Sequence, residues 1–136
     1  WAKAIGAMSD VLYVCAPTPL QHGVTAGIRA LGPSFYSDLT KEHQQKRDRF
    51  CGALAQAGLP PAVPQGAYYV LADVSRLPGK TSRERALYLL DKTGVAGVPG
   101  EAFFEGPDGS RFMRFCMAKT DQDLERASQA IERFTS

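Results

Sequence analysis

Apolar and polar positions alternate most regularly between residues 112 and 118, and this alternation predicts a strand. Met113, Phe115 and Met117 share one face, which we expect to pack against helices. The opposite face carries Phe112, Arg114, Cys116 and Ala118. A guanidinium among apolar neighbours stays charged, so it needs an anionic partner, a hydrogen-bonded site or an opening to water. The environment of Arg114 is therefore the first question that the pattern raises.

Other extended segments follow from residue type and from turn signals. Residues 67–74 are β-branched and aromatic, which predicts a strand. Residues 95–98 predict a short strand that ends at Pro99-Gly100, and residues 106–109 predict a tight turn. Residues 11–16 are apolar and are expected to be extended.

Helices are predicted where apolar residues recur at helical spacing between start and stop signals. The expected helices are residues 2–10, a helix from Thr18-Pro19 to Gly32, a longer one from Ser34 to Gly58, one from Thr81 to Gly94, and one from Thr120 through Phe134. Thr81 with Glu84 has the spacing of a capping box, and Thr120 with Asp123 is a similar start.

The order of these elements predicts an α+β fold, a small sheet of about three strands with helices packed on one face. Residues 1–31 look less integrated and are expected to be a connecting helical segment from a neighbouring large domain. Residues 32–136 are expected to form a small C-terminal α/β domain.

Composition excludes several classes of protein. The formal charge is +2 with acidic and basic residues interspersed, which argues against nucleic acid as a partner. No apolar run has the length that spans a bilayer, so no membrane partner is expected. The three cysteines are widely spaced and form no CxxC pair, which favours reduced thiols and a cytoplasmic protein. The absence of an initiator Met suggests a fragment, a processed product or a trimmed chain.

Several side chains are candidates for chemistry. Arg114 either grips a substrate carboxylate with two parallel hydrogen bonds or pairs with an Asp or Glu across the sheet. Cys116 shares its face, so it is either a reactive thiolate or a small buried hydrophobe. His22 and His43 lie in helices without partners at metal-ligand spacing, so no metal site is expected. Tyr68 and Tyr69 point to opposite faces, so one of them is a candidate to line a cleft.

Four segments taken in order resemble the C-terminal part of class I/II aminotransferases, fold-type I enzymes that use pyridoxal phosphate. They are CAPTPLQ (15–21), QGAYYVLADVS (65–75), GVAGVPGEAFF (94–104) and MRFCMAK (113–119). The branch with aspartate and kynurenine aminotransferases is the most similar. The resemblance covers nearly the whole chain and implies the small domain of such an enzyme.

The resemblance implies that Arg114 binds the α-carboxylate of the amino acid substrate, and that residues 98–103 border the substrate entrance. It also implies that residues 13–18 lie near the partner subunit's active site in a homodimer. The family's cofactor lysine and most phosphate ligands lie upstream of the match, and none of the six lysines here has the Schiff-base context. This chain is therefore expected to contain no catalytic or cofactor-binding residue and to be inactive alone.

The implied reaction of the complete enzyme moves an amino group from an amino acid to a 2-oxo acid, with pyridoxal phosphate as the electron sink. Two other hypotheses stay open from the residues. One is a free-standing regulatory α+β module that binds a carboxylate through Arg114 without catalysis. The other is a thiol enzyme built on Cys116.

Overall fold

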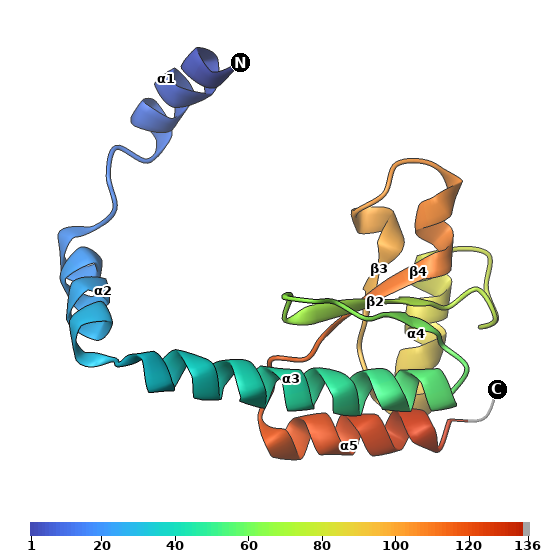
Figure 1. The fold of residues 1–136 in the computed structure, drawn as a ribbon. Coiled ribbons are helices and arrows are strands. Elements are labelled where there is room, and N and C mark those ends of the chain that lie inside the picture. The colour runs from blue at the N-terminus through green and yellow to red at the C-terminus, as the bar shows by residue number, and fades with distance from the viewer. Residues whose placement is uncertain (135–136) are drawn as a thin grey trace. The chain divides into compact units, whose positions relative to one another are not determined.

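The computed structural model describes residues 1–134, and the chain divides into two compact units, residues 1–39 and residues 40–136. Helices dominate the first unit: α1 (Ala2–Leu12), α2 (Thr18–Ala30) and the first part of α3 (Pro33–Gln56). The remainder of α3 and all strands belong to the second unit (Figure 1). A domain boundary after residue 31 stays a prediction.

The first helix is longer than the sequence predicted. α1 continues through Val11 and Leu12, and the Tyr13 N–H donates a hydrogen bond to the Ser9 carbonyl oxygen at 2.9 Å. The expectation of an extended chain from residue 11 is therefore wrong for these two residues. The helical hydrogen bonds continue past the point where apolar, β-branched character suggested a strand.

α2 begins at Thr18, as predicted, with Pro19 in its first turn, where a missing N–H costs nothing. Its apolar residues Leu20, Val24 and Ile28 are each more than 60% exposed. No helix within residues 1–134 combines the length and the apolar content that crossing a membrane requires.

The second unit contains an antiparallel sheet of four strands in the order β1-β2-β4-β3. The strands are β1 (Pro61–Ala62), β2 (Tyr69–Asp73), β3 (Val98–Pro99) and β4 (Phe112–Cys116). The small α+β sheet is confirmed, and β1 is the strand that the expectation of about three did not include. A proline is tolerated there because β1 is an edge strand, where one N–H of the chain needs no ladder partner.

Two helices of this unit begin at the predicted caps, and the earlier one also ends at its predicted glycine, whereas the later helix ends at Glu132. The hydroxyls of Thr81 and Thr120 each accept a hydrogen bond at 3.1 Å, from the N–H of Glu84 and of Asp123 respectively. Gly94 ends the earlier helix in the left-handed region, with φ 72°. The helices are α4 (Ser82–Thr93) and α5 (Asp121–Glu132).

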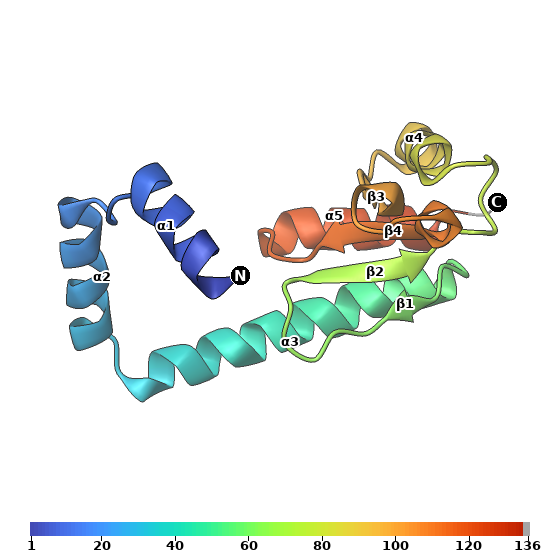
Figure 2. The same cartoon turned by 90° about the horizontal axis from the view of Figure 1, so that it is seen from above.

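The two faces of the sheet differ as the alternation predicted. Met113 and Phe115 are 0% and 2% exposed, whereas Arg114 between them is half-buried. The core on the buried face is completed from α3, α4 and α5 by Phe50, Leu54, Leu89, Leu124 and Ile131. Helices therefore cover one face of the sheet (Figure 2), and the face of Arg114 is left without a helical cover in the second unit.

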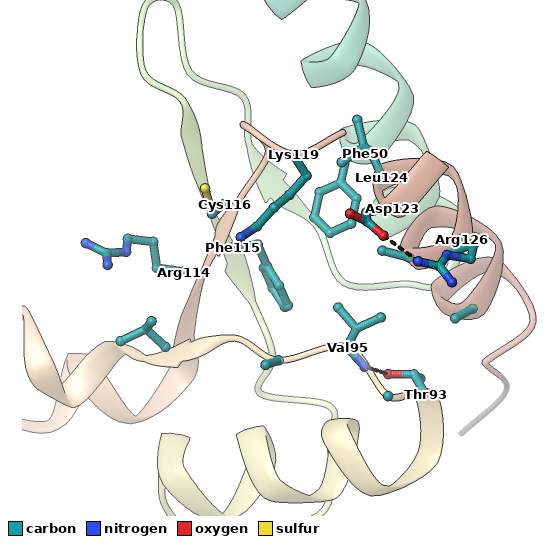
Figure 3. Close-up of a pocket in the computed structure, with 15 residues that line it drawn as sticks. Phe50, Thr93, Val95, Arg114, Phe115, Cys116, Lys119, Asp123, Leu124 and Arg126 are labelled. Atoms are coloured by element: carbon teal, nitrogen blue, oxygen red, sulfur yellow. Dashed lines mark hydrogen bonds and ion pairs between the residues drawn. The ribbon is translucent and has the colours of Figure 1, made fainter. Parts of the chain in front are cut away.

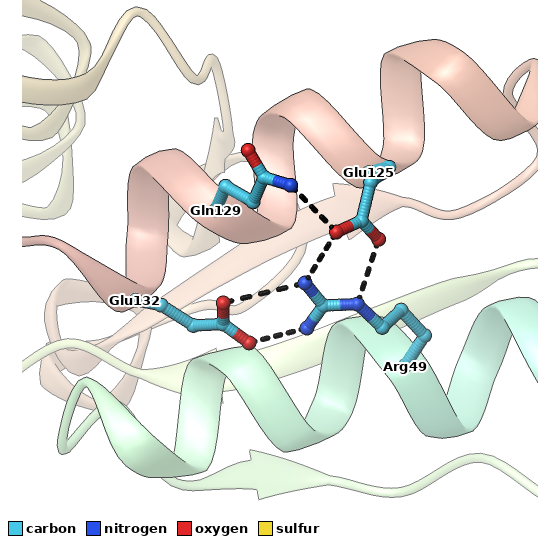
Figure 4. A network of polar contacts seen from close by, with 4 residues as sticks. All are labelled: Arg49, Glu125, Gln129 and Glu132. Atoms are coloured by element: carbon cyan, nitrogen blue, oxygen red, sulfur yellow. Dashed lines mark hydrogen bonds and ion pairs between the residues drawn. The ribbon is translucent and has the colours of Figure 1, made fainter.

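α3 and α5 lie side by side, and an ionic network joins them (Figure 4). Arg49 of α3 donates to Glu125 at 2.8 and 3.0 Å and also to Glu132, both on α5. Gln129 donates to Glu125 at 2.8 Å. The hydrogen bonds from Arg49 and then Gln129 lower the pKa of Glu125 to about 2. The network fixes two helices that carry much of the core beneath the sheet.

Candidate functional site

The candidate site is the uncovered face of the sheet, with Arg114 near its middle. In the strand register, Leu71 of β2 and Val98 of β3 are both paired with Arg114, one on each side. The central strand β4 thus presents the guanidinium between two neighbouring strands. This placement follows from the alternation of side chains, which puts Arg114 opposite the buried Met113 and Phe115.

Two aromatic rings flank the Arg114 guanidinium. Its central carbon lies 5.0 Å from the ring centroid of Tyr69 and 4.3 Å from that of Phe103. Within residues 1–134, Arg114 makes no hydrogen bond or ion pair that satisfies ordinary distance and angle limits. A guanidinium carries five N–H donors in a planar fork, so these donors are available to an anion.

Arg111, which directly precedes β4, provides a contrast. Its Nε and Nη2 atoms donate to Asp73 Oδ2 at 3.1 and 2.5 Å. Burial raises the pKa of Asp73, but hydrogen bonds from Ser75 and Arg111 outweigh this and lower the pKa to about 2. Asp73 of the neighbouring strand therefore pairs with Arg111. Arg114 does not form the ion pair across the sheet that the sequence analysis gave as the alternative to carboxylate binding.

The loop after β3 places Phe103 over the guanidinium. This loop contains the 3-10 turn η1 (Gly100–Ala102), and the Phe103 N–H donates to the Gly100 carbonyl oxygen at 2.8 Å. The Glu101 N–H donates to the Ser82 hydroxyl at 3.2 Å, which ties the loop to α4.

Gly100 is required by close packing. A Cβ at that position would lie 2.5 Å from the Gly109 carbonyl oxygen and 2.6 Å from that of Phe112. Gly109 belongs to η2 (Pro107–Arg111), a 3-10 turn in the segment where the sequence predicted a tight turn, and Phe112 begins β4. The small residue thus lets two backbone segments meet beside the site.

Cys116 shares the face of Arg114, as predicted, and its register partner on β2 is Tyr69. It is exposed, so the interpretation of Cys116 as a small buried hydrophobe is wrong. The reason is that helices pack only on the other face. Cys51 is the buried thiol instead, and burial raises its pKa.

The histidines contribute nothing to this face. His22 lies in α2 and is exposed, and His43 lies in α3 and is half-buried. No cluster of His, Cys, Asp and Glu suited to a metal ion occurs among residues 1–134.

A hollow of about 560 Å³ lies between the α4–β3 connection, β4 and α5, and Arg114 and Cys116 are among the residues that line it. Its lining mixes apolar side chains such as Phe115 and Val95 with Lys119 and the ion pair of Asp123 and Arg126. Figure 3 shows the Arg114 side chain extending away from these groups, on the other side of β4. Arg114 therefore borders the hollow, with its guanidinium directed away from Lys119 and Asp123. The sequence did not reveal this hollow.

Sequence reasoning missed the aromatic neighbours of Arg114 as functional residues. It treated Tyr68 and Tyr69 as alternatives for lining a cleft, and it placed Phe103 only within residues 98–103, which the resemblance puts at the substrate entrance. The available signal was that the predicted strand with Arg114 follows two segments that contain aromatic residues, 67–74 and 94–104.

The second unit is thus a small antiparallel sheet with helices on one face and the Arg114 guanidinium on the other. The family model "Aminotransferase class I and II" matches residues 1–131, and this chain belongs to that family. Enzymes of this family generally depend on pyridoxal phosphate.

Individual relatives agree with this assignment. The chain is 30% identical to kynurenine–oxoglutarate transaminase 3 of Homo sapiens, over 90% of this chain and 31% of the relative. It is 34% identical to LL-diaminopimelate aminotransferase of Dehalococcoides mccartyi, over 69% of this chain and 23% of that protein.

Among solved structures, YbdL of Escherichia coli, described as having a methionine aminotransferase function, superposes with a TM-score of 0.78. The sequence identity is 28%, and the match covers 92% of this chain and 32% of YbdL. The chain therefore spans about a third of the length of the relatives that it matches.

Proposed function

We propose that this chain is the substrate-carboxylate-binding part of a pyridoxal-phosphate-dependent aminotransferase, which moves an amino group from an amino acid to a 2-oxo acid. Arg114 binds the α-carboxylate. The observation that carries the proposal is the guanidinium itself, which is flanked by two rings and has no carboxylate partner among residues 1–134. Asp73, the carboxylate on the neighbouring strand β2, accepts hydrogen bonds from Arg111 instead.

The geometry suits a carboxylate because a planar fork donates two parallel hydrogen bonds to the two oxygens. A charge-assisted hydrogen bond of this kind is worth about 1.5–3 kcal/mol. Holding the carboxylate at two points also fixes the orientation of the Cα–H bond, and orientation of the reacting bond is a large part of catalysis. The contribution of this chain is therefore binding and positioning.

The residues of this face do not fit a pyridoxal phosphate site. β2, β4 and the loop from residue 98 to residue 104 carry no lysine, and Lys119, which lines the hollow with Arg114, shares that lining with the carboxylate of Asp123. We propose that the part of the complete enzyme outside this chain binds the cofactor. When bound, the cofactor supplies the electron sink for the reaction.

We also propose that the complete enzyme is a cytoplasmic homodimer. Three free cysteines among the described residues are consistent with a reducing compartment. Sedimentation of the complete enzyme at a series of concentrations tests the dimer, and a monomer at all concentrations would contradict it.

The test of Arg114 is substitution in the complete enzyme. Arg114→Ala is expected to lower kcat/KM for the amino acid about 10- to 100-fold or more, because it removes the charge-assisted hydrogen bonds to the substrate carboxylate. Arg114→Lys is not expected to restore activity, since the planar fork is lost. Steady-state kinetics with the amino acid and with a matched amine that lacks the carboxylate measures both effects.

Arg111→Ala is the matched control, because Arg111 directly precedes the same strand but is paired with Asp73. Its effect should be the same for the two substrates. The proposal fails if Arg114→Ala keeps near-normal kcat/KM for the amino acid while its cofactor content is unchanged.

A further inference from the structure

Arg114 is the centre of a group of aromatic contacts that come from two separate segments of the chain. Tyr69 lies on β2, and Phe103 follows η1 in the loop after β3. Tyr68 packs edge-on against Tyr69, with ring centroids 4.9 Å apart and an interplanar angle of 78°. The guanidinium is therefore held between side chains of two elements that are distant in sequence.

The chemistry of this arrangement differs from that of an ion pair. A ring attracts a cation through its electron-rich face and takes none of the N–H donors as a carboxylate does. Arg111 shows the other case, since Asp73 occupies its Nε and one of its terminal nitrogens. Two rings restrain the Arg114 guanidinium and leave its hydrogen-bonding edge available.

Both rings are also accessible. Tyr69 is 37% exposed and Phe103 is 46% exposed, so neither is a core residue of this chain. Phe103 is held in place by its backbone hydrogen bond to Gly100, in a loop fixed to α4 through Ser82. Exposing an apolar ring to water is unfavourable, so two ordered, exposed rings beside one cation are consistent with a role other than core packing.

We infer that Tyr69 and Phe103 are positioning residues that hold the Arg114 fork in its carboxylate-binding orientation. The inference rests on the proposed function of Arg114. Restraining the guanidinium before the substrate arrives reduces the conformational freedom lost on binding, and so strengthens the hold on the carboxylate. The two rings act through Arg114 and take no part in the chemistry.

The experiment uses the complete, cofactor-loaded enzyme. Phe103→Leu and Tyr69→Leu remove a ring and keep an apolar side chain, whereas Phe103→Tyr and Tyr69→Phe keep the ring. The Leu variants are expected to lower kcat/KM for the amino acid about 3- to 30-fold, the range of a cation–π contact, and to weaken binding of propionate by a similar factor in calorimetry. The ring-keeping variants should stay within about twofold, because the aromatic face is retained.

Two controls separate positioning from a general structural role. The Leu variants should leave kcat/KM for a matched amine without a carboxylate within about twofold, and in an Arg114→Ala background they should cause no further loss. An equal loss with amine and amino acid, or the same loss without Arg114, overturns the inference. If Phe103→Leu does not fold, propionate binding by Tyr69→Leu decides.

The outcome also distinguishes this inference from the proposed function. If Arg114→Ala lowers kcat/KM while both Leu variants do not, the rings are not positioning residues and Arg114 remains the anchor. If Arg114→Ala itself has no effect, the proposed function fails, and the inference fails with it.

Discussion

At the scale of single residues, Arg111 and Arg114 lie three positions apart and have opposite surroundings. The register pairs Leu71 with Arg114 and Asp73 with Phe112, so the carboxylate of Asp73 lies toward the beginning of β4. Arg111 takes that carboxylate, and Arg114 meets aromatic rings. A register shifted along the strands would exchange these roles, so the site depends on the pairing as well as on the residue.

Gly100 gives a prediction at the same scale. Gly100→Ala would place a Cβ against two backbone oxygens, so the loop that carries Phe103 must move. We expect a loss of about 1–3 kcal/mol in the free energy of unfolding, as for other overpacked sites. Urea unfolding of the chain measures it.

Gly66→Ala is the matched control, since a Cβ there meets nothing within 4 Å. It should change the free energy of unfolding by less than about 0.5 kcal/mol, as surface substitutions usually do. An equal effect of the two substitutions would contradict the packing argument for Gly100.

At the scale of elements, the ionic network between α3 and α5 is the strongest polar contact between helices described above. Arg49 forms ion pairs with both Glu125 and Glu132, and the hydrogen bonds to these carboxylates raise the pKa of Arg49 above its ordinary value. Networks around one arginine are worth more than isolated surface pairs, because one ordered side chain serves several bonds.

We predict that Arg49→Met lowers the midpoint of thermal unfolding by a few degrees, because two carboxylates on α5 lose their cation and repel each other. Arg126→Met is the matched control, since Arg126 forms its ion pair within α5 only. Thermal unfolding followed by circular dichroism compares the two variants. A larger effect of Arg126→Met would show that the contact between helices does not stabilise the unit.

At the scale of the whole molecule, the carboxylates with lowered pKa set the response to acid. Asp73 and Glu125 each have a pKa of about 2, below their ordinary values near 4. A group whose pKa is lowered by folding stabilises the folded state above its unfolded pKa. That stabilisation is lost as the pH falls through the folded pKa.

We therefore predict that the free energy of unfolding is nearly constant from pH 7 to about pH 5 and falls steadily between about pH 5 and pH 2. Urea titrations at a series of pH values measure this slope. Glu125→Gln should flatten the slope below pH 5, because it removes one of the carboxylates whose pKa is lowered by folding. An unchanged slope would show that the Arg49 network does not couple to stability.

Short-range patterns determined most elements. Alternation between residues 112 and 118 predicted which side chains of β4 are buried, and Thr81, Gly94 and Thr120 predicted helix ends correctly. The end of α1 and the two-residue strand β1 were not predicted. Their signals are weak, because two or three residues carry little periodicity and neighbouring hydrogen bonds decide their state.

The sequence by itself determined that Arg114 lies on a strand face opposite the core, because alternation is a local property of the backbone. The resemblance of the sequence to aminotransferases also suggested that Arg114 binds a substrate carboxylate. Only the tertiary structure decided the neighbours of the guanidinium. Tyr69 and Phe103 come from other segments, and Asp73 is assigned to Arg111 by strand register. Contacts between distant segments depend on pairing and packing of the whole fold, which no local pattern encodes.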